Sequence, residues 1–203
     1  MIPKKREQSV YSHVVVHDYG FAPNPYGGLL SIATCKPRIR SSAHLGDWVV
    51  GVGSTKTVGG ERVVYAALVN EIVPMEVYGS EERFLVKRPV FRAETWQQVG
   101  DSVYYRNDSG DWARRPSLHD ASHVKRDLSG KRVLLAQEFY YFGASAPSLP
   151  AALGALVNPG RGHKRFTDGH LLSILESWLR STFESGILGK PYHEVPRKRI
   201  VRA

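Results

Sequence analysis

Residues 45–54 read LGDWVVGVGS, and residues 61–73 read ERVVYAALVNEIV. Both stretches are rich in Val and contain an aromatic residue, a composition that fits a pleated, half-buried surface. Gly and Asn residues near their ends are typical of strand boundaries. The glycines at positions 59 and 60 predict a tight turn between the two strands. We therefore expect a β-hairpin here.

Four other segments share this composition, so more short strands are expected on both sides of the hairpin. They are SVYSHVVVH at 9–17, GLLSIATC at 28–35, DSVYYRN at 101–107 and KRVLLAQEFYYFG at 131–143. A short helix is expected within residues 74–84. Residues 144–166 contain three prolines and several glycines, which predict a loop with one short turn of helix.

One longer helix is predicted from Thr167 to about Glu184, where Leu and Trp recur at helical spacing on one face. Thr167 is the expected N-cap and Gly186 the expected C-terminal stop. The fold class is therefore α+β, with a small curved sheet or a small β barrel and one main C-terminal amphipathic helix. At 203 residues, the chain fits a single domain with its core at about 9–190 and basic tails at both ends.

The composition is that of a globular protein, with 42% hydrophobic and 23% charged residues. No segment approaches the roughly 20 apolar residues that span a bilayer, and the first ten residues do not resemble a secretory signal. Cys35 is the single cysteine, which excludes an intramolecular disulfide and a multi-cysteine metal site. We expect a cytoplasmic protein with no membrane partner.

The charge balance favours a polyanionic partner. Lys and Arg number 28 against 19 Asp and Glu, so the net charge is +9. Release of counterions drives such a chain towards nucleic acid. The ends MIPKKR and PRKRIVRA hold most of the excess, so it fits either DNA contact or solvated tails.

The segment HDYGFAPNPYGG, residues 17–28, contains prolines and glycines that give a loop a fixed shape. A His beside a carboxylate can act as a general base. His17 and Asp18 are therefore candidate catalytic residues, and Tyr19 beside them is a candidate for binding a base or phosphate. The alternative is a structural loop whose polar groups cap one another.

The segment ATCKPRIR, residues 33–40, places a thiol directly before three cations. Positive charge near a thiol lowers its pKa and favours the nucleophilic thiolate, so Cys35 is a candidate nucleophile. Lys36 and Arg38 are candidates for binding phosphate. A lone cysteine also fits the role of a small buried hydrophobic residue.

Two further segments carry candidate binding residues. In EFYYFGASAP, residues 138–147, Tyr140 and Tyr141 are expected on opposite faces of a predicted strand. One of them could stack on a base, or both could belong to a core that covers the two faces of the strand. In NPGRGHKRFTDGH, residues 158–170, a basic loop precedes the main helix and either binds phosphate or is simply solvated. Its candidate residues are Arg161, His163 and Lys164.

His119 and His123 have the His-x-x-x-His spacing of one helical face, with Asp120 and Asp127 nearby, and these are residue types that bind metal ions. The stretch lacks the Glu of the zinc protease motif and a strong helical pattern. We therefore predict no metal ligands and no cofactor.

The chain resembles the second of the nucleotide-modification-associated domain families. The resemblance rests on HDYGFAPNPYGGLLSIATCKPRIR, LGDWVVGVGS, FYYFG and GRGHKRF. It implies a bacterial or phage protein linked by gene neighbourhood to modified DNA bases, and it brings no established active site. The motif positions that it implies are His17, Asp18, Cys35, Lys36, Pro37, Arg38, Asp47, Tyr140, Tyr141 and His163.

The hairpin region is also similar to small barrels of the PUA, ASCH and EVE kind, which implies a barrel that binds RNA or modified bases. Together these readings favour an enzyme that modifies a DNA base or nucleotide. The alternatives are a non-catalytic reader of modified bases and an accessory subunit of a modification or restriction system. The expected partners are DNA or a nucleotide, together with other modification or restriction proteins.

Overall fold

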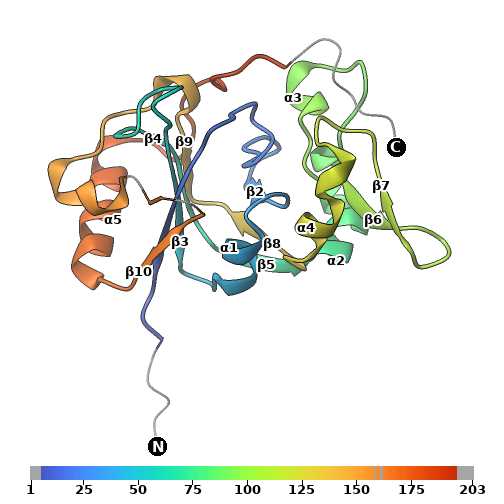
Figure 1. Ribbon diagram of the computed structural model, residues 1–203, viewed down its shortest axis with the longest axis horizontal. Helices are drawn as coiled ribbons and strands as arrows, with labels where there is room; N and C mark the ends of the chain where they lie inside the picture. Colours follow the sequence, from blue (N-terminus) through green and yellow to red (C-terminus); the bar gives the residue numbers. More distant parts are fainter. Residues whose placement is uncertain (1–5, 158, 161, 196–203) are drawn as a thin grey trace, which may run out of the picture.

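The computed structural model describes residues 6–157, 159–160 and 162–195 (Figure 1). Its strands form three sheets: six strands in the order β10-β1-β3-β4-β9-β11, three in the order β2-β8-β5, and the pair β6-β7. The strands are β1 (Val10–Val14), β2 (Leu30–Ile32), β3 (Trp48–Val52), β4 (Val63–Leu68), β5 (Glu71–Pro74), β6 (Tyr104–Arg106), β7 (Trp112–Arg114), β8 (Arg132–Ala136), β9 (Phe139–Tyr141), β10 (Lys164–Phe166) and β11 (Gly186–Ile187).

The helices are mostly short and lie between these strands. The α-helices are α1 (Pro37–Ser42), α2 (Met75–Ser80), α3 (Thr95–Gln98), α4 (Val124–Leu128) and α5 (Gly169–Thr182). The 3-10 helices are η1 (Glu82–Lys87), η2 (Ala121–His123), η3 (Gly143–Ser145) and η4 (Ala151–Leu156). The α+β class is confirmed. None of the described helices is long and apolar enough to cross a bilayer.

The predicted hairpin is confirmed as β3 and β4, which pair antiparallel with Trp48 opposite Leu68. Gly59 in the connecting turn has φ 107°, a conformation that glycine adopts without strain. Side chains alternate across the sheet, because Trp48 and Val50 belong to one core cluster while Val49 belongs to another. The hairpin therefore separates two cores.

Helix α5 covers one face of the six-stranded sheet (Figure 1). Its buried residues Leu171, Leu172, Leu175 and Leu179 pack in one cluster with Trp48, as the helical spacing predicted. The N-cap is Asp168 rather than Thr167, because the Asp168 carboxylate accepts the backbone N–H groups of His170 and Leu171.

Of the two expected arrangements, a small curved sheet and a small β barrel, the closed barrel does not form. The segments 61–73 and 131–143 each break into two strands. The first passes from the six-stranded sheet (β4) to the three-stranded sheet (β5), and the second passes from the three-stranded sheet (β8) back to the six-stranded sheet (β9). Asn70 fixes this corner, since its side-chain oxygen accepts the backbone N–H of Gln137 at 2.7 Å. The result is two open sheets that pack on each other rather than one closed sheet.

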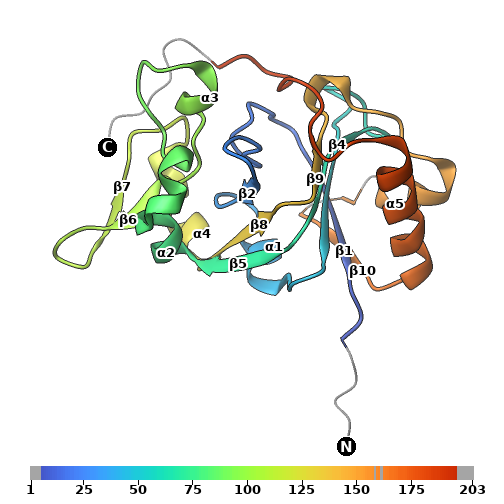
Figure 2. The ribbon, with the colours of Figure 1, turned by 180° about the vertical axis from the view of Figure 1, so that it is seen from behind.

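The core cluster that contains Val49 lies between these two sheets. Another core cluster lies under α2, η1 and β6, on the far side of the three-stranded sheet (Figure 2).

A buried carboxylate, Asp47, secures the start of β3. It accepts the backbone N–H groups of Ser9 and His44, at 2.8 and 2.9 Å, and pairs with Arg6. Asp47, one of the motif positions, therefore has a structural role.

Candidate functional site

The turn between β2 and α1, residues 33–36, presents Cys35 in an unusual backbone conformation. Cys35 has φ 55° and Lys36 has φ 41°, values that side-chain-bearing residues adopt at a cost of order 1–3 kcal/mol each. Pro37 then begins the helix, where its fixed φ suits the first turn. We call residues 33–36 the cysteine turn.

Asp127 on α4 and Arg40 on α1 hold the cysteine turn in place. The Asp127 Oδ1 atom accepts the backbone N–H of Cys35 at 2.9 Å. Arg40 is fully buried and donates to the carbonyl oxygens of Cys35 at 2.9 Å, of Arg132 at 2.8 Å and of Asp127. The Arg40 guanidinium therefore ties three segments together and serves the fold.

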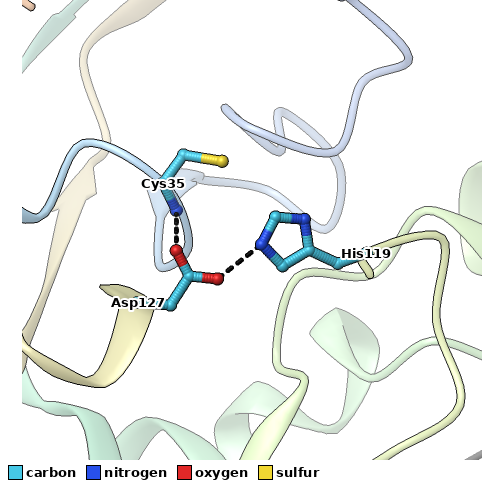
Figure 3. A group of neighbouring side chains, drawn as sticks. All are labelled: Cys35, His119 and Asp127. Atoms are coloured by element: carbon cyan, nitrogen blue, oxygen red, sulfur yellow. Dashed lines mark hydrogen bonds and ion pairs between the residues drawn. The ribbon is translucent and has the colours of Figure 1, made fainter. Parts of the chain in front are cut away.

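Cys35, His119 and Asp127 form a compact cluster (Figure 3). The His119 Nε2 atom lies 2.5 Å from Asp127 Oδ2, which also accepts the Tyr104 hydroxyl at 3.0 Å. One nitrogen, sulfur or oxygen atom from each of the three residues lies within 4.8 Å of those of the others. Asp127 is fully buried, His119 is 8% exposed and Cys35 is partly exposed.

The surroundings of the cluster shift the pKa values of Asp127 and Cys35 in opposite directions. Burial raises the pKa of Asp127, but hydrogen bonds from His119, Tyr104 and Cys35 outweigh it and hold that pKa below its ordinary value. Burial and the nearby Asp127 charge raise the pKa of Cys35, and Arg126 and Lys36 oppose this more weakly. The expected lowering of the thiol pKa is therefore wrong, and Cys35 rests as a thiol.

A cavity of about 1000 Å³ opens over the cluster and has Cys35 and His119 in its wall. Its volume is that of a site for a small organic ligand. Lys36, Arg38 and Arg126 line it, so its wall is cationic. Two aromatic rings, Tyr19 and Phe21, also line it. We call this the central cavity.

Another hydrogen-bonded pair reaches the wall of the central cavity. His13 lines the cavity, and its Nε2 atom lies 2.6 Å from the Tyr65 hydroxyl. Burial, followed by the charge of Lys36, lowers the pKa of His13 well below its ordinary value. His13 is therefore neutral, and its Nε2 atom accepts a hydrogen bond from the Tyr65 hydroxyl.

The structure brings several of the predicted residues to the central cavity from three separate segments. These residues are His17, Tyr19, Cys35, Lys36, Arg38 and His163. Lys36 and His163 both have lowered pKa values, and Lys36 also makes a hydrogen bond. The Lys36 Nζ atom donates to the Val14 carbonyl at 3.2 Å, and burial lowers its pKa. Burial and the charges of Arg38 and Lys36 lower the pKa of His163.

Other predicted residues lie elsewhere. The Asp18 carboxylate bonds to the Tyr141 hydroxyl and to the backbone N–H groups of Gly20 and Tyr192, and no hydrogen bond to His17 is found among the described residues. His17 is exposed, so the two do not form the expected acid–base pair.

The two tyrosines of β9 are buried in different cores, Tyr140 beside Trp48 and Tyr141 beside Leu134. Neither offers a face to a base, and the two-sided core strand is the arrangement found. Lys164 lies on β10, is exposed and is outside the cavity lining. Arg161 lies outside the described residues.

The sequence spacing places His119 and His123 on one helical face, with Asp120 and Asp127 nearby, and the structure shows a different relationship. His119 precedes η2, Asp127 lies on α4, and the third member of the cluster is Cys35 rather than His123. The sequence signal was the presence of His and Asp in a polar segment. Their link to Cys35 depends on tertiary packing.

Comparison with protein-family models matches residues 7–198 to nucleotide modification associated domain 2, which is nearly the whole chain. This match confirms the family that the sequence motifs indicated. No curated protein and no solved structure matches the chain.

Proposed function

Since this chain belongs to the family of nucleotide modification associated domain 2, we propose that it is an enzyme acting on a nucleobase or nucleotide. Cys35 is the nucleophile, and His119 with Asp127 is the acid–base pair. Arg38 and Arg126 bind the phosphate, and the base lies against Tyr19 or Phe21. His119 thus takes the role first assigned to His17.

The observation that carries this proposal is the relationship between the thiol and the imidazole. A thiol whose pKa is raised needs a base before it can attack. His119 lies in the same cluster, and its Nε2 bond to Asp127 leaves Nδ1 as the proton acceptor. No hydrogen bond joins Cys35 to His119 in the part of the chain that the structure describes, so the proposed proton transfer requires a side-chain rotation or a bridging water.

The proposed first step moves one proton and forms one bond. The thiol proton of Cys35 passes to His119, and the sulfur electron pair attacks an electrophilic carbon of the bound substrate. The electron pair displaced from that carbon moves to an electronegative atom of the substrate. His119 then returns the proton to that atom, and the Asp127 carboxylate stabilises the imidazolium in between.

The charge and shape of the central cavity support a nucleotide as the ligand. Arg38 and Arg126 are both exposed at the cavity and can pair with phosphate oxygens. Tyr19 and Phe21 supply aromatic faces on which a base can stack. A flipped base of DNA and a free nucleotide both suit this arrangement.

Nucleoside mass spectrometry tests the proposal in cells that carry this gene and its neighbours. DNA digests and the free nucleotide pool are compared among strains with the intact gene, without the gene, with Cys35→Ser and with Lys56→Gln. Lys56 is exposed on the β3–β4 loop and serves as the matched control. The deletion and Cys35→Ser are expected to change the same nucleoside, whereas Lys56→Gln leaves it unchanged. Identical profiles with the intact gene and with Cys35→Ser would overturn the proposal.

A reader of modified bases is the second candidate, favoured by the aromatic rings that line the cavity. A reader needs Phe21 and no reactive thiol. Under this alternative, the nucleoside profiles match with and without the gene. Cys35→Ser then leaves binding to modified DNA intact, while Phe21→Ala weakens it.

A further inference from the structure

The cluster of Cys35, His119 and Asp127 has the donor set of a zinc site. A thiolate, an imidazole nitrogen and a carboxylate oxygen are the three ligand types that zinc binds in proteins. The three donor atoms lie within 4.8 Å of one another, and this is the only such group found in the part of the chain that the structure describes. We propose that these residues bind a zinc ion.

The surroundings of the cluster fit a three-ligand site. The backbone N–H of Cys35 and the hydroxyl of Tyr104 both donate to the Asp127 carboxylate, and these two hydrogen bonds orient the carboxylate as a ligand. Cys35 and His119 face the central cavity, which leaves a fourth position for water or another ligand. Tetrahedral zinc needs ligand bonds of about 2.0–2.3 Å, so the direct bond between His119 and Asp127 must open slightly to admit the ion.

Zinc binding would oppose the proposed chemistry, and this part of the inference rests on the proposed function. The thiol binds as a thiolate and releases its proton to solvent, so the sulfur electron pair is held by the metal. The imidazole nitrogen is likewise occupied. A zinc-loaded chain has no nucleophile and no base at this site, and the metal therefore acts as an inhibitor of Cys35.

Cobalt(II) is the probe for this site, because it accepts the same ligands and its spectrum reports them. Titration of the metal-free, untagged chain with cobalt chloride is expected to produce a thiolate-to-cobalt charge-transfer band and the intense visible bands of tetrahedral cobalt. One equivalent of zinc should remove both bands, since zinc binds such sites more tightly than cobalt.

Variants decide which side chains hold the ion. Cys35→Ser should abolish the charge-transfer band, and His119→Gln and Asp127→Asn should each remove the tetrahedral spectrum. Tyr104→Phe should weaken cobalt binding by roughly 10-fold, because the Asp127 carboxylate loses the hydrogen bond that orients it. His170→Gln changes an exposed histidine on α5 and should leave both bands unchanged.

Two results would overturn the inference. One is the absence of a charge-transfer band with cobalt in excess, and the other is a spectrum that survives in both His119→Gln and Asp127→Asn. Neither depends on catalysis. Failure of zinc binding therefore leaves the nucleoside experiment as a separate test of the proposed function.

Discussion

The carboxylate of Asp127 accepts the backbone N–H of Cys35 at 2.9 Å, across 92 residues of sequence. Its other oxygen binds His119 and Tyr104. One side chain therefore fixes both the conformation of the cysteine turn and the orientation of the imidazole. These two roles can be separated by substitution.

Asp127→Asn should preserve the fold and impair the chemistry. The amide oxygen can still accept the N–H of Cys35, but the amide nitrogen now donates to His119 and forces the wrong tautomer. A comparable change in a serine protease triad lowers kcat about 10⁴-fold, and we expect a loss of the order of 10³–10⁴ in turnover. Thermal unfolding checks that the variant is folded.

Asp127→Ala, in contrast, should destabilise the chain as well, by about 2–4 kcal/mol, because the buried N–H of Cys35 and hydroxyl of Tyr104 lose their acceptor. Denaturant unfolding of both variants measures this difference. Equal stability of Asp127→Asn and Asp127→Ala would contradict the structural role of the carboxylate.

Alkylation of Cys35 should be slow at neutral pH. Burial and Asp127 raise the thiol pKa, so the rate of reaction of the metal-free chain with iodoacetamide should rise with pH through a midpoint above about 8.5. The chain has one cysteine, so the signal is unambiguous. Arg126→Gln removes a charge that lowers the pKa and should move the midpoint higher still. Lys125→Gln is the exposed neighbouring control, and a midpoint below the ordinary value would refute the assignment.

Arg40→Met should cost at least about 3 kcal/mol of stability. The guanidinium satisfies three carbonyl oxygens, and each buried acceptor left without a donor costs about 1–3 kcal/mol. Arg38→Met on the same helix is the matched control. Arg38 is exposed, so we expect a change within about 0.5 kcal/mol. Urea unfolding compares the two, and a similar loss in both would show that Arg40 does not secure the fold.

Lys87 should make stability depend on pH above neutrality. Its Nζ atom is buried and donates to the carbonyl oxygens of Leu29 and Asn24 and to the Asn24 side chain, while desolvation lowers its pKa to about 8. Between pH 8 and the unfolded value of about 10.4, the unfolded chain binds more protons than the folded one. The free energy of unfolding therefore rises with pH in this window, by up to about 1.4 kcal/mol per pH unit.

The measurement is the difference between the intact chain and Lys87→Met, taken by denaturant unfolding at several pH values from 7 to 10. The difference removes the contributions of other titrating groups. The free energy of unfolding of the intact chain, minus that of Lys87→Met, should rise with pH between about 8 and 10. A difference that stays constant with pH would show that Lys87 has an ordinary pKa.

Local patterns in the sequence were sufficient for the β3–β4 hairpin and for α5, because turn glycines and helical spacing act over a few residues. They did not predict that Asn70 turns the chain from one sheet into another, so they left a small curved sheet and a barrel both open where two open sheets form. This corner depends on the N–H of Gln137, which is 67 residues away.

Contacts between residues far apart in the sequence also limited the prediction of the site. The residue types alone singled out the basic segment around Cys35 and Arg38, and both of these side chains line the central cavity. His17 and Asp18 of the neighbouring loop were the predicted acid–base residues, whereas the residues that the structure clusters with Cys35 are His119 and Asp127 from distant segments. The direction of the Cys35 pKa shift could not be predicted either, because it depends on burial of the thiol, which raises the pKa where neighbouring cations were expected to lower it.

The long separation between Cys35 and its acceptor also affects how the chain is made. At about 5–20 residues per second, a ribosome needs roughly 5–20 s to synthesise the 92 residues that separate Cys35 from Asp127. During that interval the backbone N–H of Cys35 lacks its acceptor and the side chain lacks its full cover, so the thiol is open to oxidants as an ordinary cysteine is. Docking of α4 onto the cysteine turn therefore shields the new thiol only after the ribosome has passed residue 127.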